Sequence, residues 1–175
     1  MARSILLIRH AEKPVPQSGV FGVASDGLPD PQGLSVRGWQ RAGALAALFG
    51  TVGQMDAPLT RPSALYAAAD PGRSHRPRDT LQPLADRLQL PIQPLASNGD
   101  PAAVAAQLAA ASGDPLVCWR HRELPSLARA LLGPGADQAP AQWDEQCFDL
   151  IWVIRSGRLA VMPQCLLAGD AQLIR

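Results

Sequence analysis

The sequence has a single lysine, Lys13, among its 16 lysine and arginine residues. Arginine therefore carries nearly all of the positive charge, and with 15 acidic residues the formal net charge is only +1. A chain this close to neutrality has no strong overall attraction to nucleic acid or to an anionic membrane surface. We expect neither kind of partner.

Cysteine is also scarce. Cys118, Cys147 and Cys165 have no Cys-x-x-Cys or other metal-ligand spacing, which excludes the common zinc motifs and favours reduced thiols. The sequence shows no signal peptide before the first apolar run, no run long enough to cross a bilayer and no internal repeat. These absences predict a cytoplasmic protein.

The bulk composition is typical of one globular domain. Apolar residues make up 47% of the 175 residues and charged residues 18%, which is enough apolar material for a substantial core. We expect a single domain over residues 1–175.

Strands and helices are predicted to alternate along the chain. Short apolar runs predict strands over residues 4–8, 64–68, 91–95 and 116–119, and helical spacing predicts helices over 35–49, 74–88, 100–111 and 124–132. Two β-rich runs, 148–155 and 158–162, predict a C-terminal hairpin. The order predicts a three-layer α/β fold, in which a mostly parallel central sheet has helices on both faces and the hairpin at its margin.

Proline and glycine mark three further features. Pro83 warns of a kink within the helix predicted over 74–88, whereas Pro91 and Pro94 indicate an edge strand. The segment 15–33 is rich in Gly, Pro, Ser and Asp and is expected to be a loop. It is long for a compact domain, which makes it a candidate functional loop.

Two of the predicted strands end in the same pair of residues. Arg9-His10 follows the first strand and Arg120-His121 follows the strand over 116–119. Because α/β sheets bind ligands beyond the carboxyl ends of their strands, both histidines should face one crevice. Arg122 is the next residue, and since neighbouring strand residues face opposite ways, only one of Arg120 and Arg122 should point inward.

A third basic segment reaches the same edge of the sheet. It lies around the start of the helix predicted over 74–88 and carries Arg73, His75, Arg76 and Arg78. A helix N-terminus favours anions, and with two histidines and several arginines nearby the predicted ligand is phosphate. We interpret His75 as a loop residue and Arg73 and Arg78 as solvated, although either arginine could touch a substrate.

In this order the motifs resemble those of the histidine phosphatase superfamily, also called phosphoglycerate mutase-like. Residues 6–12, Leu-Leu-Ile-Arg-His-Ala-Glu, resemble its Arg-His-Gly/Ala signature, and Leu34-Ser35-x-x-Gly38-x-x-Arg41-Ala42 resembles the helix that follows. Arg76-x-x-Asp79-Thr80 resembles its Arg-x-x-Gln-Thr motif, with Asp in place of Gln, and residues 116–121 resemble the strand that carries its second histidine. The four motifs run in register over residues 4–155.

The resemblance implies a phosphatase that needs no metal and no cofactor. His10 would be the nucleophile and would form a phosphohistidine. Arg9 and Arg76 would hold the phosphoryl oxygens, and His121 would donate to the same phosphoryl group. The expected partner is a small phosphorylated substrate or a phosphohistidine protein.

The general acid is open at this point. Mutase-like relatives carry a Glu between the second Arg motif and the second-histidine strand, where this chain has none, and acid-phosphatase-like relatives carry an Asp where this chain has Arg122. Glu12 and Glu123 rank equally as candidates, and an Asp also stays open, since the segment before the second-histidine strand offers Asp86, Asp100 and Asp114. A phosphohistidine or an acyl phosphate, which has a good leaving group, would need the acid least.

Two alternatives to a phosphatase follow from the same residues. One is a phosphoglycerate-mutase-type phosphotransferase, which the short segment between residues 80 and 116 disfavours. The other is a catalytically weak module that binds a phosphorylated ligand, and the uncertain acid is its main support.

Overall fold

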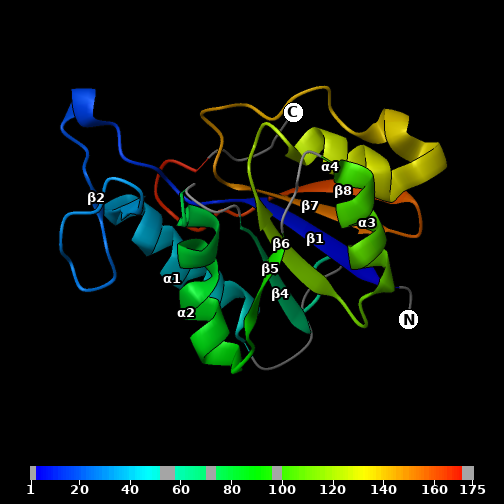
Figure 1. Ribbon diagram of the computed structural model, residues 1–175, viewed down its shortest axis with the longest axis horizontal. Coiled ribbons are helices and arrows are strands. Elements are labelled where there is room, and N and C mark those ends of the chain that lie inside the picture. Colours follow the sequence, from blue (N-terminus) through cyan, green and yellow to red (C-terminus); the bar gives the residue numbers. More distant parts are fainter. Residues whose placement is uncertain (1–2, 52–57, 70–73, 96–99, 171–175) are drawn as a thin grey trace.

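A six-stranded sheet runs through the centre of the computed structural model, which describes residues 3–51, 58–69, 74–95 and 100–170. Its strands are β1 (Ser4–Arg9), β4 (Ala64–Ala68), β5 (Ile92–Leu95), β6 (Pro115–Trp119), β7 (Leu150–Arg155) and β8 (Arg158–Pro163). The strand order is β5-β4-β6-β1-β7-β8 (Figure 1). The first four strands in this order are parallel, whereas β7 is antiparallel to β1 and to β8. The predicted fold class is confirmed, with β5 at one edge and the hairpin at the other.

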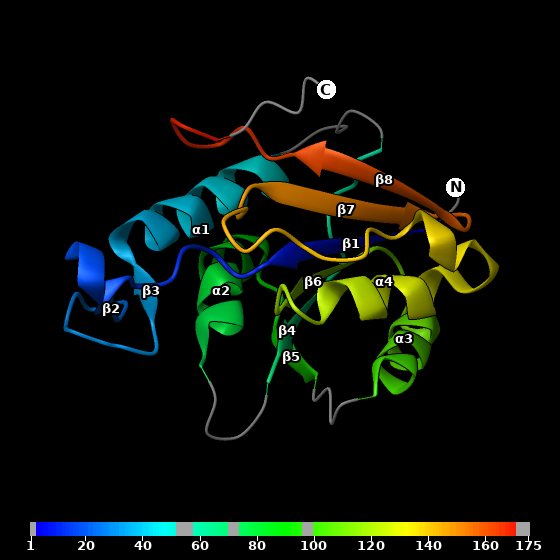
Figure 2. The same cartoon turned by 90° about the horizontal axis from the view of Figure 1, so that it is seen from above.

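Helices cover both faces of this sheet. They are α1 (Val36–Phe49), α2 (Arg76–Leu88), α3 (Pro101–Ala110) and α4 (Leu124–Leu132), followed by a 3-10 helix over Gly133–Gln138. Figures 1 and 2 show α1 and α2 on one side of the sheet and α3 and α4 on the other. Within the described residues no helix is long and apolar enough to cross a membrane.

The apolar run of β1 is explained by this double cover. Leu6 and Ile8 pack in one core cluster with Phe49 of α1, whereas Leu7 packs in the opposite cluster with Leu127 of α4. Because successive side chains of a strand alternate between faces, a strand covered on both sides is apolar at every position. Burial thus selects the unbroken run that ends at Arg9.

The start of α1 lies against the segment that follows β1. Ser35 caps the helix as predicted, since its Oγ accepts from the N–H of Gly38 at 3.1 Å. Its own N–H donates to the Glu12 carbonyl at 2.9 Å. A Cβ on Gly38 would lie 2.5 Å from that same carbonyl oxygen, so the close approach requires glycine here.

Two features differ from the simplest sequence interpretation. Helix α2 continues through Pro83 to Leu88, so this proline does not end it. The segment 15–33, expected as a loop, also contains a 3-10 helix over Pro16–Ser18 and the strand β2 (Gly22–Val23), which pairs with β3 (Leu34–Ser35). This lobe projects from the side of the molecule in Figure 1.

Candidate active site

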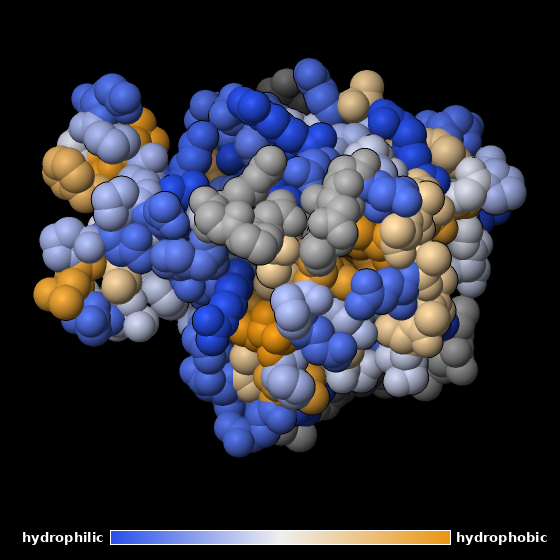
Figure 3. Space-filling view, in the orientation of Figure 1, coloured by the Kyte–Doolittle hydropathy of each residue, from blue (hydrophilic) through white to orange (hydrophobic). Residues whose placement is uncertain are grey.

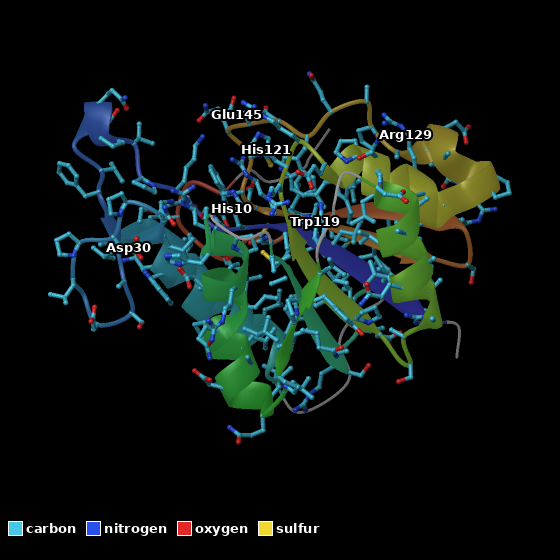
Figure 4. All side chains as sticks on the ribbon, in the orientation of Figure 1. His10, Asp30, Trp119, His121, Arg129 and Glu145 are labelled. Carbon is cyan, nitrogen blue, oxygen red and sulfur yellow. The ribbon has the colours of Figure 1, made fainter. Side chains whose placement is uncertain are left out.

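A pocket of about 330 Å³ lies beyond the carboxyl ends of β1 and β6. These strands are adjacent and parallel, and the N–H of His10 donates to the Trp119 carbonyl at 3.2 Å. The pocket is lined by His10, Ser74, Arg76, Pro77, Arg120, His121, Arg122 and Glu123. Four residues singled out from the sequence as catalytic are therefore brought together, and Figure 4 shows two of them, His10 and His121, at this end of the sheet.

The ring of His10 is held in one tautomer. Its Nδ1 lies 2.8 Å from the carbonyl oxygen of Ala11. A carbonyl only accepts, so Nδ1 carries the proton and Nε2 keeps a free lone pair in the neutral ring. Burial lowers the pKa of His10 to about 3, helped by the charges of Arg9 and Arg76 and opposed by the bond to Ala11. At neutral pH the imidazole is therefore uncharged and nucleophilic.

Arg9 is fully buried beside His10 and fixes the loop that precedes β7. Its Nη1 donates to the carbonyls of Glu145 at 2.5 Å and of Cys147 at 3.0 Å, and its Cζ lies 3.7 Å from the ring centroid of Phe148. Its Nε and Nη2 have no hydrogen-bond partner among the described residues. Burial lowers the pKa of Arg9 to about 10, so it stays charged at neutral pH, with the N–H groups of Nε and Nη2 left for an anion.

Arg76 is the first residue of α2 and is positioned by the projecting lobe. Its Nε donates to the Gly33 carbonyl at 2.8 Å and its Nη2 to the Pro31 carbonyl at 2.9 Å. Burial lowers the pKa of its guanidinium, while Asp30 and Asp79 act in the opposite direction. The lobe thus holds a cation at a helix N-terminus, where an anion is already favoured.

His75 connects the same lobe to α2. Its Nε2 lies 3.0 Å from Asp30 and its Nδ1 lies 2.6 Å from Asp79. The sequence interpretation as an ordinary loop residue missed this bridge, although the i,i+4 spacing to Asp79 was a signal for it. Arg78 lines a different pocket, which runs along α2 to the start of β5, and Arg73 lies outside the described residues.

The prediction for Arg120 and Arg122 is wrong, because both line the pocket beside His121. Strand β6 ends at Trp119 and residues 120–123 form a turn, so the alternation of an extended strand does not apply. Burial and the charge of Arg9 lower the pKa of His121. The turn thus presents two arginines beside an imidazole whose neutral form is favoured.

The two candidate acids lie in different places. Glu123 lines the pocket, and its Oε2 accepts from Trp119 Nε1 at 3.1 Å and from Arg120 Nη1 at 3.2 Å. Glu12 is instead paired with Arg41 at 2.8 Å and Arg37 at 3.2 Å and lines a separate pocket. Of the two, Glu123 is the carboxyl group within reach of a ligand beside His10.

The surroundings favour an anion. Arg76, Arg120 and Arg122 line the pocket, with the buried Arg9 close behind His10. The upper part of the face in Figure 3, where the loops beyond β1 and β6 lie, is mainly hydrophilic. Among the described residues no group of three His, Cys, Asp or Glu is placed to hold a metal ion.

Comparisons with known proteins bear on the fold. No family model matches the sequence, and no curated protein matches it. A mycobacterial glucosyl-3-phosphoglycerate phosphatase superposes with a TM-score of 0.58 at 15% identity, covering 93% of this chain and 99% of that one. A candidate alpha-ribazole-5'-P phosphatase from Escherichia coli K-12 superposes with a TM-score of 0.55 at 16% identity, covering 93% and 96%.

The chain has the phosphoglycerate mutase-like fold that these two phosphatases share. A candidate phosphohistidine phosphatase from Nakamurella multipartitia has the same architecture, with a TM-score of 0.50 at 16% identity over 91% of this chain and 87% of that one. The resemblance inferred from the four sequence motifs is therefore confirmed at the level of the fold. What this fold does in the present chain rests on the residues of its pocket.

Proposed function

We propose that the protein is a metal-independent phosphatase that acts through a phosphohistidine intermediate on His10. The observation that carries this proposal is a neutral imidazole, with Nδ1 bound to Ala11, in one pocket with Arg76 and His121. A neutral ring attacks phosphorus without first losing a proton. Fixed guanidinium groups match the charge that spreads over the phosphoryl oxygens in the transition state.

The reaction would proceed in two steps. In the first, the Nε2 lone pair of His10 attacks phosphorus, and the bond from phosphorus to the leaving atom breaks. That atom takes the bonding pair and, where it is basic, a proton from the Glu123 carboxyl group. In the second step a water oxygen attacks phosphorus, the P–N bonding pair returns to Nε2 and the water gives a proton to the Glu123 carboxylate. Arg9, Arg76 and His121 would donate to the phosphoryl oxygens throughout.

The leaving group has room beside the phosphoryl pocket. A second pocket of about 650 Å³ extends from His121 and Arg122 to the loop over residues 141–145. The two pockets share these two residues, which supports a substrate larger than phosphate itself. The substrate would be a small phosphorylated molecule or a phosphohistidine protein, as the names of two structural neighbours illustrate. The three cysteines are free, in keeping with the cytoplasmic location that we propose.

A panel of substrates whose phosphoryl groups are radiolabelled tests the proposal. The wild-type protein and His10→Ala are incubated with 4-nitrophenyl phosphate, acetyl phosphate, glycerol phosphate and phosphohistidine. We expect phosphate release and an acid-labile, base-stable label on the wild-type protein only. His121→Ala should still take the label, because His121 is not the nucleophile. Asp137→Asn, an exposed substitution outside the pocket, controls for handling.

The outcomes separate the alternatives. A label that survives His10→Ala would overturn the assignment of the nucleophile. In a separate incubation, the protein is mixed with phosphoglycerates and a labelled bisphosphate. Transfer of the label to a phosphoglycerate without net release of phosphate would show a phosphotransferase. Binding of phosphate with no release from any substrate would leave a phospho-ligand-binding module.

A further inference from the structure

One buried hydroxyl group lies where three segments of the candidate site meet. Thr80 is fully buried in the second turn of α2. Its Oγ1 accepts from the N–H of Ala11 at 2.9 Å and donates to the carbonyl of Arg76 at 2.8 Å. These two bonds join the residue after His10 to the first residue of α2.

The first bond fixes the peptide beside the nucleophile. The N–H of Ala11 is held by Thr80, and the carbonyl of the same residue accepts from Nδ1 of His10. Ala11 is itself fully buried. If the hydroxyl were removed, this N–H would lie in the core without a partner, which is unfavourable. The carbonyl that sets the tautomer of His10 therefore belongs to a residue that Thr80 holds in place.

The second bond connects this arrangement to Arg76. The hydroxyl donates to the backbone of the residue whose guanidinium lines the pocket. A single atom, Oγ1 of Thr80, thus joins the backbone of Ala11, which follows the nucleophile, to the backbone of Arg76, whose guanidinium would hold the phosphoryl group. Because Arg76 and Thr80 lie in the same helix, any shift of α2 against the end of β1 must break the bond between Thr80 and Ala11.

The third segment is β6. On this strand the Cys118 thiol lies beside the Thr80 side chain, one residue before the strand ends at Trp119. Cys118 is paired in register with Ile8 of β1, two residues before His10. Thr80 therefore contacts the strand that leads to His121 as well as the segments of His10 and Arg76.

We infer that Thr80 is a positioning residue whose hydroxyl fixes the ring of His10 relative to Arg76. This inference rests on the proposed phosphatase function. The physical reason is geometric: attack requires the nucleophile and the phosphoryl clamp to be aligned, and a displacement of about 1 Å can cost on the order of 10²-fold in rate. Thr80 itself touches no substrate, because it is buried behind Ala11.

Three substitutions test this role. Thr80→Val keeps the shape of the side chain and removes both hydrogen bonds, whereas Thr80→Ser keeps the hydroxyl and removes a methyl group. Thr60→Val is the matched control, because the Thr60 hydroxyl is buried and has no hydrogen-bond partner among the described residues. We expect Thr80→Val to lower kcat for 4-nitrophenyl phosphate by about 10–100-fold with little change in KM, and both other variants to stay near the wild type.

A second readout needs no substrate. Nitrogen chemical shifts of the His10 ring report its tautomer, and we expect the Nδ1–H form in the wild type and in Thr80→Ser but a mixture in Thr80→Val. Equal losses of kcat in the Val and Ser variants, or a Val variant that keeps both kcat and the tautomer, would overturn the inference. If Thr80→Val does not fold, Thr80→Ala is measured in the same way.

The two readouts also separate this inference from the proposed function. If the wild type releases no phosphate, the phosphatase proposal fails. The tautomer measurement then still decides whether Thr80 positions His10.

Discussion

Arg41 and Asp170 form an ion pair of 2.6 Å, although only 2% and 3% of their side chains are exposed. The same Arg41 donates to Glu12 at 2.8 Å and to the Gln164 amide oxygen at 3.0 Å. Arg41 lies in α1 and Asp170 close to the C-terminus, so this network connects the end of the chain to the residue two positions after His10. The buried guanidinium is satisfied only while these acceptors stay in place.

Asp170→Asn should therefore destabilise the protein strongly. The substitution leaves part of a buried positive charge without its partner, for which we expect a loss of about 3–5 kcal/mol in the free energy of unfolding at pH 7. Urea unfolding measures it, with the exposed Asp137→Asn as the matched control.

The pH dependence of this loss has a definite sign. Burial alone would raise the pKa of Asp170, but hydrogen bonds from Arg41, Leu166 and Leu167 outweigh it and hold the pKa at about 2. A carboxyl group with a lowered pKa stabilises the fold above its unfolded pKa of about 3.9 and loses this effect on further acidification. The difference between wild type and Asp170→Asn should shrink from about pH 4 to about pH 2. A difference that stayed constant over this range would contradict the ion pair.

Substitution by alanine should have opposite effects on stability at two glycines of α1, Gly38 and Gly43. Alanine at Gly38 would place its Cβ 2.5 Å from the Glu12 carbonyl oxygen, whereas alanine at Gly43 would meet nothing within 4 Å. Gly43→Ala should stabilise the protein by up to about 1 kcal/mol, because alanine favours a helix over glycine. Gly38→Ala should instead cost about 1–3 kcal/mol, because the backbone beside His10 must move. Thermal unfolding compares the two, and equal shifts would argue against the close approach of α1.

Much of this fold could be predicted from local patterns. The unbroken apolar run before Arg9 is what a strand covered on both faces requires, and Ser35 caps α1 because its hydroxyl is the first acceptor available to the helix. Pro91 and Pro94 flank and interrupt a strand at the edge of the sheet, where a missing N–H costs least. Each of these signals lies within a few residues of the element it predicts.

The details of the site depend on contacts between distant residues, which leave no local pattern. Glu12 looked like a candidate acid because it lies two residues from His10, yet its partner Arg41 is 29 residues away. The placement of Arg122 depends on where β6 ends. Thr80 was visible only as part of a motif, because its role follows from meeting Ala11 in three dimensions. Sequence spacing thus identified the residue types of the site and not their pairings.

His10 should remain uncharged far below neutral pH. The chain has three histidines, so three imidazole signals can be followed by NMR through a pH titration. We expect one signal to stay constant down to about pH 4 and to be absent from His10→Ala, because burial and the neighbouring arginines hold the pKa of His10 at about 3. The free energy of unfolding should fall as the pH is lowered from about 6.5 to about 4. In this range the unfolded chain binds a proton at His10 that the folded chain does not bind. A His10 signal that titrates near pH 6.5 would contradict a ring kept neutral by its surroundings.

Glu123 and Glu12 should respond differently to the same change. In Glu123→Gln we expect kcat to fall by about 10²-fold for glycerol phosphate, whose alkoxide leaving group needs a proton. The fall should be small for phosphohistidine and 4-nitrophenyl phosphate, whose leaving groups depart more easily. Glu12→Gln should mainly lower the stability of the fold, because it breaks the pair with Arg41.

The dependence on the leaving group is the decisive part of this comparison. A structural role for Glu123, which also accepts from Trp119 and Arg120, would reduce kcat equally for all three substrates. Trp119→Phe removes the indole donor and keeps the carboxyl group of Glu123. It should therefore not show the selective loss of kcat for glycerol phosphate that we expect in Glu123→Gln. If Glu12→Gln rather than Glu123→Gln showed the loss confined to glycerol phosphate, the acid would be Glu12, and its pair with Arg41 would have to open during the reaction.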